Sequence, residues 1–79
     1  MEINVLLFGI ATDLVGASSL KIDLPLGANI ATLKEYISKH HQLKEMSTYA
    51  VAINESYASD STIIKENDVI AIIPPVSGG

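Results

Sequence analysis

Residues 69–79 read VIAIIPPVSGG, so that a run of Val, Ile and Ala passes without a spacer into two prolines and a Gly-Gly end. The composition of residues 69–73 is typical of a strand that has neighbours on both edges. Residues 2–8 have the same apolar, β-favouring character. We therefore expect these two strands to pair at the centre of one sheet.

The clearest alternation of apolar and polar residues predicts a second strand over residues 19–24. Leu20, Ile22 and Leu24 share one side of this segment, with charged side chains between them. Residues 10–15 suit one helical turn in the connection from the first strand. The first two strands are therefore expected to form a hairpin with a long connection.

One amphipathic helix is predicted in the middle of the chain. Its first turn has two possible caps, since either Asn29 or Thr32 could accept hydrogen bonds from the exposed amides. Ile30, Leu33 and Ile37 recur at helical spacing and form its apolar face. This face is expected to pack on the sheet.

The segment after the helix is predicted to be a polar connection, followed by two short extended segments. Leu43 and Met46 are the apolar residues expected to anchor the connection. Residues 49–54 predict a third strand, and residues 57–58 a short extended piece after a turn.

Composition excludes several classes of function. The chain has 79 residues, five lysines, no arginine and nine acidic residues, which give a net charge of -4. Such a chain has few positive charges that could bind phosphate backbones or anionic lipid, so nucleic acid and membrane partners are not expected. The absence of cysteine excludes disulfides, thiolate metal sites and thiol nucleophiles. The apolar start lacks a basic segment, so we expect a cytoplasmic protein rather than a secreted one.

The last residues form the most informative motif. Pro74 and Pro75 fix φ and lack an amide donor, which predicts a stiff stalk that cannot add to a neighbouring strand. Gly78 and Gly79 lack a Cβ, so they can enter a channel too narrow for other residues. The terminal carboxylate of Gly79 is therefore the candidate reactive group. The alternative reading is an ordinary frayed terminus.

The order of strand, hairpin partner, single helix, further strands and closing strand is similar to the ubiquitin-like β-grasp fold. The sequences at residues 5–8 (VLLF), 14–16 (LVG), 51–54 (VAIN) and 68–79 resemble the small, sulfur-carrying subunits of molybdopterin synthase. The Pro-Pro-Val-Ser-Gly-Gly end is the most specific part, because the related thiamine sulfur carriers usually lack this stalk.

The resemblance implies an α+β fold with a mixed sheet of about four to five strands, one main helix packed on one face and an extended tail. It divides the chain into a β-grasp domain at residues 1–75 and a flexible Gly-Gly tail at residues 76–79. Gly79 would be adenylated by an E1-like enzyme and then converted to a thiocarboxylate. Gly78 would accompany it into a channel of the large subunit.

The resemblance also implies that the chain is a non-catalytic subunit, with the active site on the large subunit of a heterotetramer. No cofactor is expected beyond the transient acyl-adenylate and thiocarboxylate. Expected partner contacts are Phe8, Pro74, Pro75, Val76 and Ser77. For Phe8, an interface role and an ordinary core position are equally compatible with the sequence, whereas a tail residue such as Val76 has little core to join.

The chain departs from the family at two positions. Asn67 stands where the family usually has glycine, and asparagine can adopt the same left-handed conformation. Thr12 stands near a position that is often basic, so a charged partner contact there is not expected in this chain.

Three weaker signals have simpler explanations than a functional site. His40 and His41 are adjacent and point about 100° apart on a helix, which does not suit a shared metal ion. Residues 54–56 match a glycosylation acceptor but fit a turn. Glu66 and Asp68 are expected to lie in a solvated turn rather than to form a catalytic pair.

Three alternative functions remain open at this point. The chain could carry sulfur to thiamine or to another pathway, or it could be a ubiquitin-like modifier joined to lysines through Gly79. It could also be a β-grasp binding module whose tail has no role.

Overall fold

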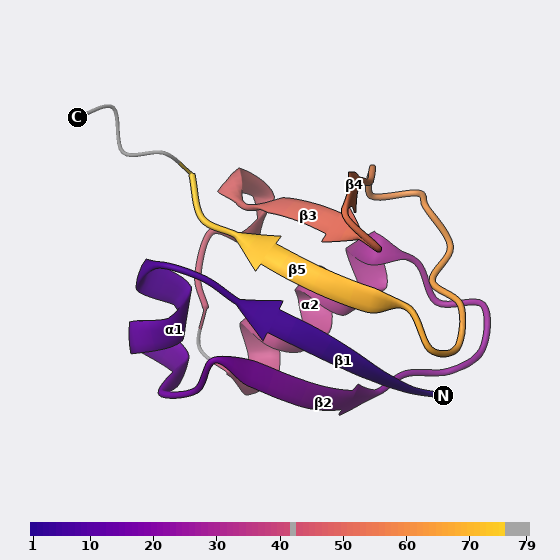
Figure 1. Ribbon diagram of the computed structural model, residues 1–79, viewed down its shortest axis with the longest axis horizontal. Helices are drawn as coiled ribbons and strands as arrows, with labels where there is room; N and C mark the ends of the chain where they lie inside the picture. Colours follow the sequence, from indigo (N-terminus) through magenta and orange to yellow (C-terminus); the bar gives the residue numbers. More distant parts are fainter. Residues whose placement is uncertain (42, 76–79) are drawn as a thin grey trace.

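The structure is a computed structural model that describes residues 1–41 and 43–75. It contains five strands, two α-helices and one short 3-10 helix (Figure 1). In chain order these are β1 (Glu2–Leu7), α1 (Ile10–Val15), β2 (Ser19–Asp23), α2 (Ile30–His40), η1 (Met46–Thr48), β3 (Ala50–Ile53), β4 (Ser56–Tyr57) and β5 (Val69–Ile73).

The five strands form one mixed sheet in the order β2-β1-β5-β3-β4. The strands β1 and β5 lie side by side and parallel, with Val5 opposite Ile70 and Leu7 opposite Ile72. The other pairs of strands are antiparallel. The predicted central pairing, the hairpin of β1 and β2, and the α+β fold class are confirmed.

One face of the sheet is covered by α2, which lies behind the strands in Figure 1. Ile30, Leu33 and Ile37 of this helix are fully buried. They belong to a single core cluster with the alternate residues of the central strands, namely Ile3, Val5, Leu7, Ile70 and Ile72. The predicted helix face and its packing on the sheet are therefore confirmed.

The start of α2 is fixed by Asn29. Its side-chain Oδ1 accepts a hydrogen bond from the backbone amide of Thr32 at 2.9 Å and one from the Thr32 hydroxyl at 3.0 Å. An asparagine cap satisfies one of the amides that a helix leaves without an internal partner. Of the two possible caps, Asn29 is the one that the structure uses.

The region between α2 and β5 differs in detail from the prediction. Leu43 and Met46 are buried as expected, but the connection also contains η1, which the polar sequence did not predict. β3 begins at Ala50, one residue later than expected. The short extended piece is the strand β4, placed one residue earlier and paired with β3. Asn67 has a φ of 72°, as predicted.

Within the described residues, no helix combines the length and apolar character needed to cross a bilayer. The expected boundary after residue 75 remains a prediction, because residues 76–79 lie outside the described part of the chain.

Candidate functional site at the base of the C-terminal tail

The parallel pairing of β1 and β5 brings two distant parts of the chain to one end of the sheet. Both strands point toward α1 in Figure 1. β1 continues through Phe8 and Gly9 into α1, while β5 continues into Pro74 and Pro75. The root of the predicted tail therefore leaves the fold beside α1.

Gly9 is the residue that allows this close approach. Its φ is 57° and its ψ is -134°, a conformation that L-residues rarely adopt. A Cβ built at this position would lie 3.0 Å from Pro74 Cγ. Glycine thus permits both the turn into α1 and the contact with the first residue of the stalk.

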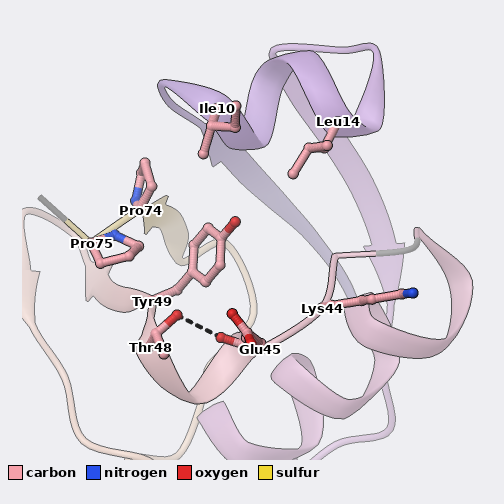
Figure 2. A pocket seen from close by; sticks show the side chains of 8 residues that line it. All are labelled: Ile10, Leu14, Lys44, Glu45, Thr48, Tyr49, Pro74 and Pro75. Carbon is pink, nitrogen blue, oxygen red and sulfur yellow. Dashed lines mark hydrogen bonds between the residues drawn. The ribbon is translucent and has the colours of Figure 1, made fainter. Parts of the chain in front are cut away.

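A groove of about 730 Å³ lies between α1 and the segment that leads into β3 (Figure 2). We call it the tail-root groove, because the two prolines form part of its wall. Ile10 and Leu14 of α1 leave 54% and 57% of their surface exposed beside it. The residues that line the tail-root groove are Ile10, Leu14, Lys44, Glu45, Thr48, Tyr49, Pro74 and Pro75.

A second apolar surface covers the side of the sheet opposite α2. Alternation along β1 and β5 places Leu6, Ala71 and Ile73 there, and Leu6 lies directly opposite Ala71. We call this surface the open sheet face, because among the described residues no helix covers it (Figure 1). Its members are Leu6, Phe8, Tyr57, Val69, Ala71 and Ile73.

Phe8 continues the outward alternation of β1 onto the open sheet face. Its side chain is 48% exposed, which is incompatible with the ordinary core position that the sequence left open. Exposing half of a phenylalanine is unfavourable in an isolated domain, and contiguous apolar surface of this kind marks interaction sites. The core position is therefore excluded for Phe8, and its role in partner binding remains a prediction.

The predicted site residues are only partly within the described chain. Pro74 is partly buried against Gly9, and Pro75 is exposed. Val76, Ser77, Gly78 and Gly79 lie outside the described residues, so their roles remain predictions.

The weaker sequence signals resolve into structural contacts. The ring of His40 stacks on Tyr36 with a centroid separation of 4.3 Å. Asn54 adopts positive φ in a turn and joins it to β5, because its amide nitrogen donates to Asp68 Oδ1 and its oxygen accepts from the amide of Val69. Asp68 Oδ2 also accepts from the amide of Lys65. Asn54 is therefore a turn residue, as the sequence predicted.

Within the described residues, no three His, Cys, Asp or Glu side chains are grouped as a metal site would require.

The tail-root groove was not predicted from the sequence. Ile10 and Leu14 were expected only as part of a helical turn over residues 10–15, and Tyr49 as the first residue of a strand. The available signal was indirect: parallel strands end at the same edge, which places α1 near the prolines.

The match to known proteins spans nearly the whole chain. Residues 5–79 match the ThiS family. The chain belongs to this family. It is 42% identical to the molybdopterin synthase sulfur carrier subunit of Arabidopsis thaliana, in an alignment covering 100% of this chain and 84% of the relative. The resemblance predicted from the sequence is confirmed.

Solved structures agree with this family assignment. A Pyrococcus furiosus protein named as subunit 1 of the molybdopterin converting factor superposes with a TM-score of 0.86 at 30% identity, covering 96% of this chain and 99% of that one. A chain from the complex of subunits 1 and 2 of the molybdopterin-converting factor of Helicobacter pylori has a TM-score of 0.71 at 27% identity, with both chains fully covered.

The same fold occurs in protein modifiers. The small archaeal modifier protein 1 of Haloferax volcanii superposes on this ThiS-family chain with a TM-score of 0.84, covering 95% of this chain and 98% of that one. At 18% identity this likeness shows the fold alone. The ubiquitin-like β-grasp architecture is therefore confirmed.

Proposed function

We propose that this ThiS-family protein is the sulfur carrier subunit of molybdopterin synthase and that it carries sulfur as a thiocarboxylate on Gly79. The observation that carries the proposal is the extent of the family match, which runs to Gly79 and therefore includes the Gly-Gly end. The relative from Arabidopsis thaliana, which is named as a sulfur carrier subunit, aligns with the entire chain.

The proposed chemistry begins with activation of a weak electrophile. A carboxylate resists acyl transfer because it has no good leaving group. Attack of the Gly79 carboxylate on the α-phosphorus of ATP, with loss of pyrophosphate, would give an acyl-adenylate. Hydrosulfide would then attack the acyl carbon, AMP would leave, and loss of a proton would give the thiocarboxylate. An E1-like enzyme in the cytosol would supply the catalytic groups for both steps.

The tail root supports such a carrier because it fixes where the tail begins. Two consecutive prolines restrict the backbone as it leaves β5. The contact of Pro74 with Gly9 ties the first proline to α1. A rigid exit reduces the conformational entropy that is lost when a partner binds the tail. The tail would thus leave the sheet in a preset direction.

The open sheet face supports docking to a large subunit of the synthase. Phe8 and Ile73 lie near the end of the sheet from which Pro74 leaves, so one partner could cover them and the tail together. The Helicobacter pylori structure is a complex of subunits 1 and 2, which is the type of assembly that we propose here, in a heterotetramer. The pterin-binding and acid-base groups would belong to the large subunit.

Intact mass spectrometry tests the carrier function directly. The full chain is incubated with ATP, a candidate E1-like enzyme and a sulfur donor, and we expect one terminal oxygen to be replaced by sulfur. The matched control lacks Gly79 and should show no such replacement. Isopeptide conjugates on lysines would instead support the modifier function. If the enzyme loads sulfur onto another carrier protein under the same conditions but leaves this chain unmodified, the proposal is contradicted.

The acceptor pathway is tested separately. Cells lacking this protein should lose molybdoenzyme activity and retain growth without added thiamine. The reverse pattern would assign the carrier to thiamine synthesis.

A further inference from the structure

We propose that the tail-root groove is a second docking site for the large subunit. The large subunit inserts an apolar side chain into the groove and forms a hydrogen bond with the Tyr49 hydroxyl. This inference rests on the proposed function, because it assumes that a large subunit binds the tail. It concerns a surface separate from the open sheet face. The lining of the groove comes from α1, from the segment before β3 and from the stalk.

The position of the groove identifies its occupant. Pro74 and Pro75 are wall residues of the groove, and the reactive tail begins at the next residue. A protein that encloses the tail must therefore lie against the second proline and beside the opening. Both the E1-like enzyme and the large subunit must reach the tail. We assign the groove to the large subunit because Phe8, on the surface that we propose docks to it, is separated from α1 only by Gly9.

The walls of the groove indicate an apolar occupant. Ile10 and Leu14 each expose more than half of their surface, although α1 is only six residues long. The rim carries Lys44 and Glu45, whose charges cancel, and the Lys44 amino group points away from the other drawn side chains (Figure 2). Burying an apolar side chain between such walls is favourable, whereas a charged group would gain no net attraction.

Tyr49 adds a polar group with no partner within the described residues. Its side chain is only 8% exposed, and its hydroxyl points between Ile10 and Leu14 (Figure 2). The hydrogen bonds of the described residues do not include this hydroxyl, whereas the neighbouring Thr48 hydroxyl donates to the carbonyl oxygen of Glu45 at 2.7 Å. Among the described residues no buried side-chain nitrogen or oxygen lacks a hydrogen-bond partner, so this hydroxyl opens into the groove rather than lying buried. Tyrosine is enriched at interfaces because its ring is apolar and its hydroxyl can bond to a partner.

Two leucine-to-lysine substitutions, one in the groove and one outside it, test the groove. Leu14→Lys places a charge in the tail-root groove, whereas Leu26→Lys places one on a leucine that is 79% exposed and does not line the groove. Calorimetric titration of each full-length variant with the purified large subunit should show about tenfold or greater weakening for Leu14→Lys. Leu26→Lys should bind within about twofold of the wild type.

A third variant tests the hydroxyl alone. Tyr49→Phe keeps the ring and its packing, so the fold should be retained. If the large subunit bonds to the hydroxyl, the affinity should fall by about threefold to tenfold, the range expected for one hydrogen bond. Unchanged affinity in Tyr49→Phe would remove the hydroxyl from the proposal.

The possible outcomes separate this inference from the proposed function. If the wild type does not bind the large subunit, the proposed function fails. If the wild type binds, and Leu14→Lys and Leu26→Lys bind equally well, only the groove inference fails. A change in self-association of Leu14→Lys in sedimentation, without loss of affinity, would assign the groove to a second copy and overturn the inference. Tighter binding by Leu14→Lys would also overturn it.

Discussion

The two faces of the sheet carry similar apolar residues but differ in what covers them. On the inner face, Val5 and Ile70 lie against the core beneath α2 and are fully buried. On the open sheet face, Phe8 and Val69 remain about half exposed. Burial of the inner face favours folding, whereas the apolar outer face gains stabilisation only when a partner covers it. The same strands therefore stabilise the fold on one side and, under the proposed function, bind the large subunit on the other.

The largest expected effect comes from a residue on neither face. Deleting Gly79 should abolish sulfur transfer by the reconstituted synthase, because the reactive carboxylate would be moved one residue toward the fold. The deletion removes no side chain, so the melting temperature should stay the same. Calorimetric melting and product formation, measured on the same preparation, check both statements. Retained transfer by the shortened chain would contradict the assignment of Gly79.

The inner face is tested by Leu33→Ala. Leu33 is fully buried in α2, and truncating a buried leucine costs about 2–5 kcal/mol of the free energy of unfolding. For a domain of this size, each kcal/mol lowers the melting temperature by about 4–8 °C. Leu26→Ala, at an exposed leucine, should change it little. Below its melting temperature, Leu33→Ala should still bind the large subunit. If the folded variant fails to bind, the inner face also contributes to binding, and the separation of roles between the two faces is wrong.

The open sheet face is tested by Phe8→Asp. Phe8 is half exposed, so this substitution should change the free energy of unfolding by about 1 kcal/mol or less. If the face docks to the large subunit, a buried charge without a partner should weaken binding by about thirtyfold or more. Titration calorimetry measures the affinity, and urea unfolding measures the stability. Comparable affinities for Phe8→Asp and the wild type would show that the large subunit docks elsewhere.

Elements set by local patterns were predictable from the sequence. The apolar runs of β1 and β5 predicted their pairing, and the spacing of Ile30, Leu33 and Ile37 predicted the face of α2. The structure agrees with these predictions because each pattern acts within one element or between two buried strands. The choice between Asn29 and Thr32 as the cap needed the structure, since both residue types can serve there.

The candidate site was less predictable because it depends on contacts between distant segments. The tail-root groove exists because α1, the segment before β3 and the prolines meet at one end of the sheet. No periodicity in any one segment encodes that meeting. The exposure of Phe8 likewise depends on what covers the outer face, which the alternation of β1 leaves open. The turn at Asn67 was predictable, because its positive φ needs only a local preference.

The smallest expected effect concerns the junction between the fold and the tail, and Gly9→Ala tests it. A Cβ at Gly9 would meet Pro74 Cγ at 3.0 Å, while one at Gly16 would meet nothing within 4 Å. Both glycines have positive φ, so each alanine variant should lose about 1–3 kcal/mol of stability. Only Gly9→Ala must also displace the stalk.

We therefore expect Gly9→Ala to lower the rate of sulfur transfer a few-fold at saturating large subunit, while Gly16→Ala transfers at the wild-type rate. Measuring both below their melting temperatures separates displacement of the stalk from loss of folded protein. The ratio of the two rates reports the displacement of Pro74 together with the additional strain at Gly9, whose ψ of -134° lies outside the left-handed helical region that Gly16 occupies. Equal rates would mean that the direction in which the tail leaves the sheet does not limit transfer.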